Sequence, residues 1–195
     1  MRILVTGTTG GIGGAVKRAA LVAGHSVVEV NRGDFVSFSS LGSDPIDGIV
    51  FTTGTCPVRP LTALADDELE ETFRVNCGLF VRLMRHVIGA KLYNPQGLKV
   101  IAISSVSATE GWAGGAAYCA SKGALSAVCR ALDAELKSRK ISVVALEPRY
   151  VKTKMFDACA GRMGVDPALA QSPDDFAAEV LRHLSERGEA ASRRL

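Results

Sequence analysis

The residues best placed to do chemistry in this sequence are a tyrosine and a lysine four positions apart, Tyr118 and Lys122. Side chains at i and i+4 lie on the same face of a helix. A free tyrosine has a pKa of about 10, and a nearby ammonium group favours the tyrosinate and lowers that pKa. The pair is therefore predicted to donate and accept a proton, with a pKa tuned toward neutral pH.

Two polar residues earlier in the chain could assist this pair, Ser105 and Asn76. Ser105 follows an apolar run, 99–104, that is predicted to be a strand, so it lies at the edge where open α/β sheets bind ligands. Its hydroxyl could hold a carbonyl oxygen beside Tyr118, with Ser107 as the alternative. Taken alone, Asn76 is most simply an exposed residue of a predicted helix.

A glycine-rich turn near the N-terminus, TGTTGGIG from position 6 to position 13, could bind a dinucleotide. Gly7, Gly11 and Gly13 allow a sharp turn and the approach of backbone N–H groups to a diphosphate, whose charge the dipole of the following helix favours. Without context, such a turn is equally well a purely structural strand-to-helix turn. Its place between the first predicted strand and the first predicted helix favours the dinucleotide.

The end of the second predicted strand indicates which dinucleotide is preferred. Val30 is followed by Asn31 and Arg32, with no acid at the tip of the strand. An acid there usually binds the ribose 2′-hydroxyl of NAD, whereas an arginine accommodates the 2′-phosphate of NADP. We therefore predict NADP(H), and Asp34 leaves NAD(H) as the alternative.

Apolar runs alternate with longer helical patterns, which is typical of an α/β fold. We predict a Rossmann-like, doubly wound parallel sheet in a single domain over residues 1–186, followed by a polar, Arg-rich tail over 187–195. The predicted helices are 12–23, 66–92, 117–139 and 173–186. The six predicted strands are 2–6, 26–30, 35–38, 48–52, 99–104 and 142–147.

Composition narrows the class of protein. The 195 residues are 47% hydrophobic with a net charge of +3, which indicates a globular chain and gives no reason to expect binding to nucleic acid. No apolar run reaches the length of a membrane span, and the first strand begins too early for a signal peptide. Five cysteines without metal-type spacing indicate reduced thiols. We expect a cytoplasmic protein without a metal.

In combination and in this order, the glycine turn, Asn76, Ser105 and the Tyr118–Lys122 pair resemble the short-chain dehydrogenase/reductase family over nearly the whole chain. The resemblance implies an acid–base tyrosine, a lysine that binds the nicotinamide ribose, a serine that orients the carbonyl, and an asparagine that disturbs its helix and supports a proton relay. The spacing of the family selects Ser105 among the neighbouring serines. The loop 111–118 is similar to that of 3-oxoacyl carrier-protein reductases.

The resemblance also implies the residues that contact the dinucleotide. These lie in the glycine turn, at the ends of the second and fourth predicted strands, at an adenine position, at the start of the predicted helix 117–139, and in a segment resembling Pro-Gly-x-Val-x-Thr. They are Gly7, Thr9, Gly11, Ile12, Gly13, Asn31, Arg32, Phe38, Thr53, Gly54, Tyr118, Lys122, Val151 and Thr153.

This chain departs from the family pattern in several places. The helix between the second and third strands is missing, and Ser37-Phe38 replaces the pair beside the adenine. Arg149 replaces a glycine, and if that position requires a positive φ the backbone should be strained. The family's seventh, C-terminal strand is predicted to be absent, and the segment 155–173 leaves only a small substrate lid. A homodimer is expected by resemblance, with a tetramer as the alternative.

We therefore predict an NADP(H)-dependent oxidoreductase that interconverts a ketone and a secondary alcohol. The alternatives are a non-catalytic NAD(P)-binding sensor and a sugar-nucleotide epimerase. Basic residues near the expected mouth of the pocket could attract an anionic or carrier-linked substrate, or could be ordinary solvated charges. They are Arg149, Lys152, Lys154 and Arg162. Trp112 either lines the substrate pocket or packs on its own loop.

Overall fold

The computed structural model describes residues 1–36, 38, 41–186 and 193–194. Its centre is a parallel sheet of six strands in the order β2-β1-β3-β4-β5-β6. The order reverses between β1 and β3, which is the kind of switch point where open α/β sheets bind ligands. The strands are β1 (Arg2–Thr6), β2 (Ser26–Val30), β3 (Gly48–Phe51), β4 (Leu98–Ile103), β5 (Ile141–Glu147) and β6 (Arg193–Arg194).

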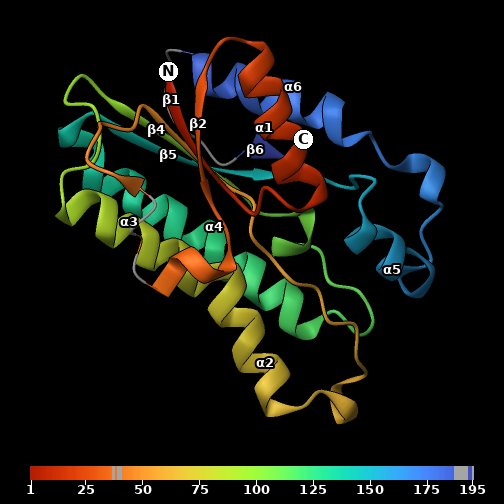
Figure 1. Cartoon of the computed structure of the whole chain (residues 1–195). Helices are drawn as coiled ribbons and strands as arrows, with labels where there is room; N and C mark the ends of the chain where they lie inside the picture. Colours follow the sequence, from red (N-terminus) through yellow and green to blue (C-terminus); the bar gives the residue numbers. More distant parts are fainter. Residues whose placement is uncertain (37, 39–40, 187–192, 195) are drawn as a thin grey trace.

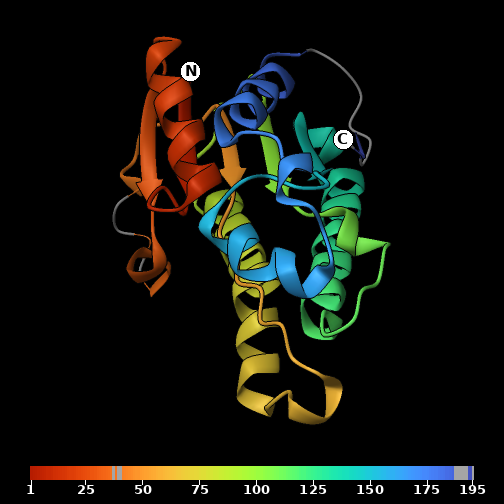
Figure 2. The same ribbon diagram turned by 90° about the vertical axis from the view of Figure 1, so that its right-hand side faces the viewer.

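Helices cover both faces of the sheet (Figures 1 and 2). α1 (Gly11–Val22) and α6 (Pro173–Ser185) pack on one face, and α3 (Leu79–Gly89) and α4 (Ala116–Leu136) pack on the other. Successive strand residues point to opposite faces, so Val5 packs with α1 and α6 while Leu4 packs with α3 and α4. Both layers are buried, which explains why the strands read as continuous apolar runs.

The predicted third strand, 35–38, is wrong. The chain forms a 3-10 helix there, Arg32–Val36, and a carboxylate oxygen of Asp34 accepts a hydrogen bond from the N–H of Asn31 at 2.7 Å. Phe35 is 2% exposed and packs edge-on against Phe51. The apolar residues that suggested a strand instead fill the core beside β3.

The sheet nevertheless has six strands, because β6 takes the sixth place. Arg193–Arg194 pairs in parallel with Leu146 and Glu147 of β5. A C-terminal strand after the last helix, which we predicted to be absent, is therefore present over two residues. Positions 187–192 and 195 of the predicted tail lie outside the described residues.

The helical regions also differ from the prediction. The predicted helix 66–92 consists of α2 (Asp66–Phe73), a π-helical turn (Arg74–Gly78) and α3. The predicted lid contains a helix, α5 (Lys154–Met163), and a short 3-10 helix, Pro167–Leu169. Further 3-10 turns are Leu61–Ala63, Val106–Ala108 and Lys137–Arg139. Within the described part of the chain, no helix has the length and apolar character needed to cross a membrane.

Candidate active site

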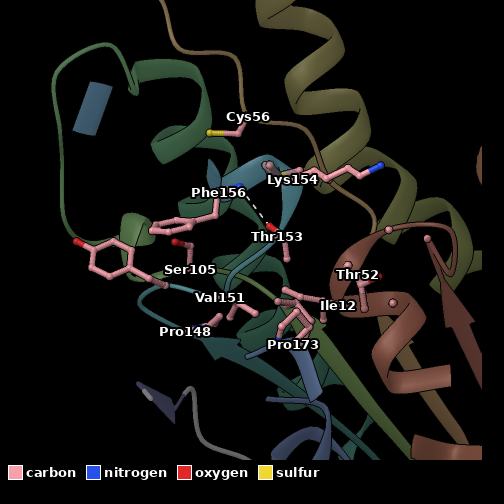
Figure 3. A pocket seen from close by; sticks show the side chains of 18 of the residues that line it. Ile12, Thr52, Cys56, Ser105, Pro148, Val151, Thr153, Lys154, Phe156 and Pro173 are labelled. Carbon is pink, nitrogen blue, oxygen red and sulfur yellow. Dashed lines mark hydrogen bonds between the residues drawn. The ribbon is translucent and has the colours of Figure 1, made fainter. Parts of the chain in front are cut away.

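A cavity of about 890 Å³ lies at the carboxyl ends of the central strands, with α5 along one side (Figure 3). This volume is in the range of small-molecule and cofactor sites. The structure brings most of the predicted site residues to its wall. They are Gly7, Thr9, Gly11, Ile12, Gly13, Asn31, Thr53, Gly54, Ser105, Tyr118, Lys122, Val151 and Thr153.

The glycine turn forms one end of the cavity, and its geometry excludes side chains at two positions. Gly7 has φ +64°, a left-handed conformation that favours glycine. A Cβ on Gly13 would lie 2.3 Å from the carbonyl oxygen of Gly7, so the turn cannot close with a larger residue. α1 begins at Gly11 and directs its N-terminus toward the cavity. This cradle fits a diphosphate bound by backbone N–H groups.

The ends of β1 and β3 are tied together by hydroxyl groups behind this turn. Thr6 is fully buried, and its hydroxyl oxygen accepts hydrogen bonds from the N–H groups of Thr52 and Thr53 at 3.0 and 3.2 Å. The Thr52 hydroxyl donates to the carbonyl of Thr6 at 2.6 Å. These contacts hold the two sides of the switch point at a fixed separation, and the sequence alone did not reveal the part played by Thr6.

At the end of β2, Asn31 lines the cavity, and Arg32 begins the following 3-10 helix. The side chain of Arg32 lies outside what the structure describes. Two carboxylates near this end are already engaged. Asp34 binds the N–H of Asn31, and Glu29 forms an ion pair with Lys17 at 2.5 Å.

The structure does not bring Phe38, the predicted adenine contact, to the cavity wall. Its ring is 8% exposed and stacks on His86, with 4.8 Å between the ring centroids. The ring also packs edge-on against Phe35 at 5.7 Å. Because the chain turns directly into a 3-10 helix after β2, this segment folds inward over α3 rather than outward along the dinucleotide site.

Tyr118 and Lys122 lie one helical turn apart near the start of α4, as predicted. Lys122 is 5% exposed, and its ammonium group donates a hydrogen bond to the carbonyl of Ile103 at 2.8 Å. The same nitrogen lies 5.7 Å from the centre of the Tyr118 ring. The backbone of β4 therefore fixes the ammonium group beside the tyrosine ring.

Contrary to the prediction, the pKa of Tyr118 is raised rather than lowered. Burial raises the pKa of Tyr118, the neighbouring thiol of Cys56 raises it further, and a hydrogen bond with Ser105 lowers it in part. Burial also lowers the pKa of Lys122 to about 8. In both cases the loss of water around the charged form is the largest cause.

Of the three neighbouring serines, Ser105 alone directs its hydroxyl to Tyr118. It caps the 3-10 turn that follows β4, and its oxygen also accepts a hydrogen bond from the N–H of Ser107 at 3.1 Å. The hydroxyl of Ser104 binds Ser126 at 2.8 Å, and that of Ser107 accepts from the Trp112 indole at 3.1 Å. The arrangement agrees with the choice of Ser105 over Ser107.

Asn76 is fully buried, so the interpretation of an exposed helix residue is wrong. It lies in the π-helical turn, which matches the expected local disturbance of the helix. Its amide group exchanges two hydrogen bonds with the backbone of Thr55, at 2.7 and 2.9 Å, and donates a third to the hydroxyl of Ser121 at 2.8 Å. A Cβ on Gly54 would lie 3.3 Å from the Asn76 oxygen and 3.7 Å from the Lys122 nitrogen, so only a small residue leaves room between them.

The segment after β5 supplies the remaining wall. Val151 and Thr153 line the cavity, and the Thr153 hydroxyl accepts a hydrogen bond from the N–H of Phe156 at 3.2 Å, which caps α5. The expected strain at Arg149 is absent. Among the described residues other than glycine, a positive φ occurs only at Phe38, Lys91 and Lys140. Arg149 instead pairs with Glu110 at 3.0 Å.

Comparison with known proteins decides the family. A family model described as short chain dehydrogenase matches residues 34–162 of this chain. This chain is a member of the short-chain dehydrogenase family. The 3-oxoacyl-(acyl-carrier-protein) reductase FabG of Salmonella typhimurium is 28% identical over 201 aligned positions, which cover 87% of this chain and 81% of that protein.

Solved structures show the same short-chain dehydrogenase fold. A family member from Francisella tularensis superposes with a TM-score of 0.84 at 17% identity, covering 99% of this chain and 96% of that one. A protein described as a putative NAD(P)-dependent gluconate 5-dehydrogenase from Beutenbergia cavernae, with bound NADP at low occupancy, also gives 0.84, at 21% identity with 98% and 94% covered. The chain is thus a Rossmann-fold oxidoreductase of this family.

The residues present fit an NAD(P) cofactor of the short-chain dehydrogenase type. The cradle at Gly7 and Gly13 would hold the diphosphate, and the cavity extends from there to Tyr118 and Lys122. A bound nicotinamide supplies or accepts the hydride. At that end the protein presents a phenol, a serine hydroxyl and an ammonium group. No group of His, Cys, Asp or Glu suited to a metal ion is found among the described residues.

Sequence reasoning missed several side chains of this short-chain dehydrogenase cavity. Cys56 and Cys159 were interpreted only as reduced thiols, yet both line the cavity. Phe156 and Met163 come from α5, a helix that was not predicted. The amphipathic pattern of residues 154–163 was the one available signal, and it is too short to separate a helix from a loop.

Proposed function

We propose that this protein is an NADP(H)-dependent oxidoreductase that interconverts a ketone and a secondary alcohol. The observation that carries the proposal is one cavity with two ends. The glycine turn at one end fits a dinucleotide diphosphate, and Tyr118, Ser105 and Lys122 lie together at the other. Neither end alone specifies carbonyl reduction, because a glycine cradle only binds and a tyrosine only transfers a proton.

In this proposal Tyr118 gives its proton to the alkoxide that forms when hydride reaches the carbonyl carbon. Ser105 orients the carbonyl oxygen, and its hydroxyl is held close to Tyr118. Lys122 binds the nicotinamide ribose and stabilises the tyrosinate. The lowered pKa of Lys122, about 8, also allows this group to exchange protons near neutral pH.

Asn76 would support the return of protons to this pair. Its side chain is locked between Thr55 and Ser121, and the Ser121 hydroxyl donates to the backbone carbonyl of Tyr118 at 2.8 Å. This buried chain of hydrogen bonds connects the π-helical turn with the start of α4. We infer that it positions a path from Lys122 to solvent.

The preference for NADP(H) rests on Arg32 at the end of β2. An arginine there can bind a 2′-phosphate through paired, charge-assisted hydrogen bonds. The acid that kept NAD(H) open, Asp34, is engaged by the N–H of Asn31 and so has less capacity for a ribose hydroxyl. The solved relative from Beutenbergia cavernae carries NADP, which agrees with this choice.

The five cysteines are free thiols, which supports a reducing compartment such as the cytoplasm.

The substrate would be a small carbonyl compound or alcohol that enters between α5 and the loop carrying Trp112. A sensor or an epimerase would use the same fold, and the test below separates these functions.

The first experiment titrates the protein with NADPH and with NADH while nicotinamide fluorescence is followed. NADPH should bind at least about tenfold more tightly than NADH, and Arg32→Ala should remove most of that difference. A panel of ketones is then supplied with NADPH. Tyr118→Phe should bind NADPH as the parent protein does but lose about 10² to 10⁴ in turnover.

Each other result has a definite meaning. Failure to bind either dinucleotide would contradict the proposed oxidoreductase function. Tight binding with no ketone reduced at any pH would favour a sensor. Unchanged turnover in Tyr118→Phe would show that Tyr118 is not the proton donor. Only the proposed dinucleotide site would then stand.

A further inference from the structure

The half of the cavity around Tyr118 differs in chemistry from the half around the glycine turn. Figure 3 shows Ser105, Phe156 and Cys56 at one end, and Ile12 and Thr52 at the other. Several aromatic and sulfur-containing side chains line the cavity. They are Cys56, Trp112, Tyr150, Phe156, Cys159 and Met163.

The rings at this end are arranged as continuous apolar surfaces. Tyr150 and Phe156 pack with 5.5 Å between ring centroids, and Trp112 lies 6.3 Å from Tyr118 in the same measure. A Cβ on Gly115 would lie 2.5 Å from the Trp112 ring, so the indole is pressed onto its own loop and cannot turn freely. Flat apolar ligands gain most from such walls.

Two cysteine side chains also line the cavity. Burial raises the pKa of the Cys56 thiol, so it stays protonated at neutral pH. Cys159 is 4% exposed, and its sulfur lies 3.7 Å from the carbonyl oxygen of Cys56, to which it donates. A protonated buried cysteine packs like a hydrophobic side chain.

Three polar or charged groups near this wall are engaged with protein partners. The Trp112 indole N–H donates to Ser107, Arg162 donates to the carbonyl of Val58 at 2.8 Å, and Arg149 pairs with Glu110. In Figure 3 the ammonium group of Lys154 points away from Ser105 and Phe156. A carboxylate bound beside Phe156 would lose its water and meet Arg149 only in competition with Glu110.

We propose that the substrate is an uncharged ketone with a flat, apolar body, such as an aryl ketone. Its carbonyl lies at Tyr118 and Ser105, and its body packs between Phe156 and Trp112. This inference rests on the proposed ketone reduction, and it decides against the anionic or carrier-linked substrate that the basic residues suggested.

The test measures binding rather than turnover. The protein is saturated with NADP⁺, which cannot reduce a ketone, and three probes are titrated by calorimetry: acetophenone, its para-carboxylate, and dihydroxyacetone. Trp112 is the single tryptophan, so its emission reports contact at this wall. Acetophenone should bind at least about tenfold more tightly than either polar probe, because the aromatic and sulfur-containing side chains of the wall offer apolar area.

Variants locate the effect. Phe156→Ala should weaken acetophenone about tenfold, while the affinity for NADP⁺ shows that the fold is intact. Phe156→Leu keeps most of the apolar volume, so it should weaken acetophenone binding less than Phe156→Ala does. Leu169→Ala is the matched control, because Leu169 follows α5 in the chain and is 69% exposed. It should leave all three affinities unchanged.

The inference is overturned if the para-carboxylate binds best and Arg149→Ala removes that preference, or if dihydroxyacetone binds best. It is also overturned if no probe binds the NADP⁺ complex, or if Phe156→Ala leaves acetophenone binding unchanged. Because these readouts need no turnover, they are independent of the proposed reaction. Selective aryl ketone binding with no reduction by NADPH would contradict the proposed reaction and would show only that the cavity prefers a flat, apolar ligand.

Discussion

Burial shifts the pKa values of the two central residues of the site in opposite directions. In the proposed reaction, Lys122 keeps a positive charge inside the protein and Tyr118 forms a negative charge there. Loss of water is the largest cause for both groups, which favours a neutral tyrosine beside a lysine that releases its proton at about pH 8. The proposed reaction therefore needs a further interaction that stabilises the tyrosinate.

Lys122→Met tests the cost of this buried charge. The pKa of Lys122 is lowered from 10.5 to about 8 in the folded state, so below pH 8 the folded protein bears the full cost of the charge. Between pH 8 and 10 the folded state loses this proton while the unfolded state keeps it, so the cost falls with rising pH. In urea unfolding, the free energy of unfolding of the parent protein should rise relative to that of Lys122→Met by about 2 kcal/mol over this range.

Comparing the two proteins cancels the titration of the cysteines, which both contain. Lys137→Met, at an exposed position just after α4, is the control and should show a constant difference. A gap between the parent and Lys122→Met that does not change with pH would mean that water reaches the Lys122 ammonium group in the folded protein.

At the scale of elements, the π-helical turn is the feature that moves a polar side chain into the core. The turn places Asn76 where it can satisfy both backbone groups of Thr55. Asn76→Ala leaves these groups without their partner and should lower the free energy of unfolding by about 1–3 kcal/mol. Denaturant unfolding measures this change.

The catalytic part of this prediction is separate. Asn76→Ala should also reduce ketone turnover more than it reduces NADPH affinity, because the proposed proton path is lost and the glycine cradle is not. Gln96→Ala, at an exposed loop position, should change the free energy of unfolding by less than about 0.5 kcal/mol. Normal turnover in Asn76→Ala would reduce this residue to a structural role.

A second prediction concerns the contact between α1 and α5. An added Cβ on Gly11 would lie 2.6 Å from the Thr153 Cγ2 atom, so the first residue of α1 touches the cap of α5. Gly11→Ala should push α5 away from the diphosphate cradle and weaken NADPH binding about tenfold. Fluorescence titration measures this loss.

A second substitution, at Thr153, should relieve the clash made by Gly11→Ala. Thr153→Ser removes Cγ2 and keeps the capping oxygen, so adding it to Gly11→Ala should restore part of the lost affinity, and a double-mutant cycle should show coupling. Gly161→Ala, in the same α5 with nothing within 4 Å of its added Cβ, should be neutral or slightly stabilising. Strictly additive effects would show that α5 moves independently of the cradle.

At the scale of the whole molecule, α2 and α3 expose large apolar side chains. Leu69, Phe73 and Val81 are between 36% and 43% exposed. We propose that this surface, with α4 beside it, forms the homodimer expected from the family resemblance. Light scattering after size exclusion should give twice the chain mass of 20.5 kDa.

Charge at this surface should separate the subunits. Phe73→Asp should raise the dissociation constant of the dimer at least about tenfold. The measured mass should then move toward that of a single chain. Val22→Asp is the control, because Val22 is 90% exposed at the end of α1 on the opposite face of the sheet. An unchanged dimer in Phe73→Asp would place the interface elsewhere, and a single-chain mass for the parent protein would exclude the dimer.

The sequence by itself was sufficient wherever the determining interactions are local. The glycine turn, the four-residue spacing of Tyr118 and Lys122, and the position of Ser105 after β4 follow from strand and helix geometry over a few residues. The doubly wound parallel sheet follows from the alternation of apolar runs and helical patterns. The family resemblance added the disturbed helix at Asn76, which a lone asparagine could not indicate.

Only the tertiary structure decided the features that depend on distant segments. Cys159 meets Cys56 across 103 positions of chain, and β6 pairs with β5 although its two residues carry no strand pattern. Phe35 and Phe38 turn into the core because β3 and α3 cover them there. The pKa of Tyr118 rises because burial, which no spacing encodes, outweighs the opposing hydrogen bond with Ser105. Spacing sets which groups can meet, and packing sets how much water remains around them.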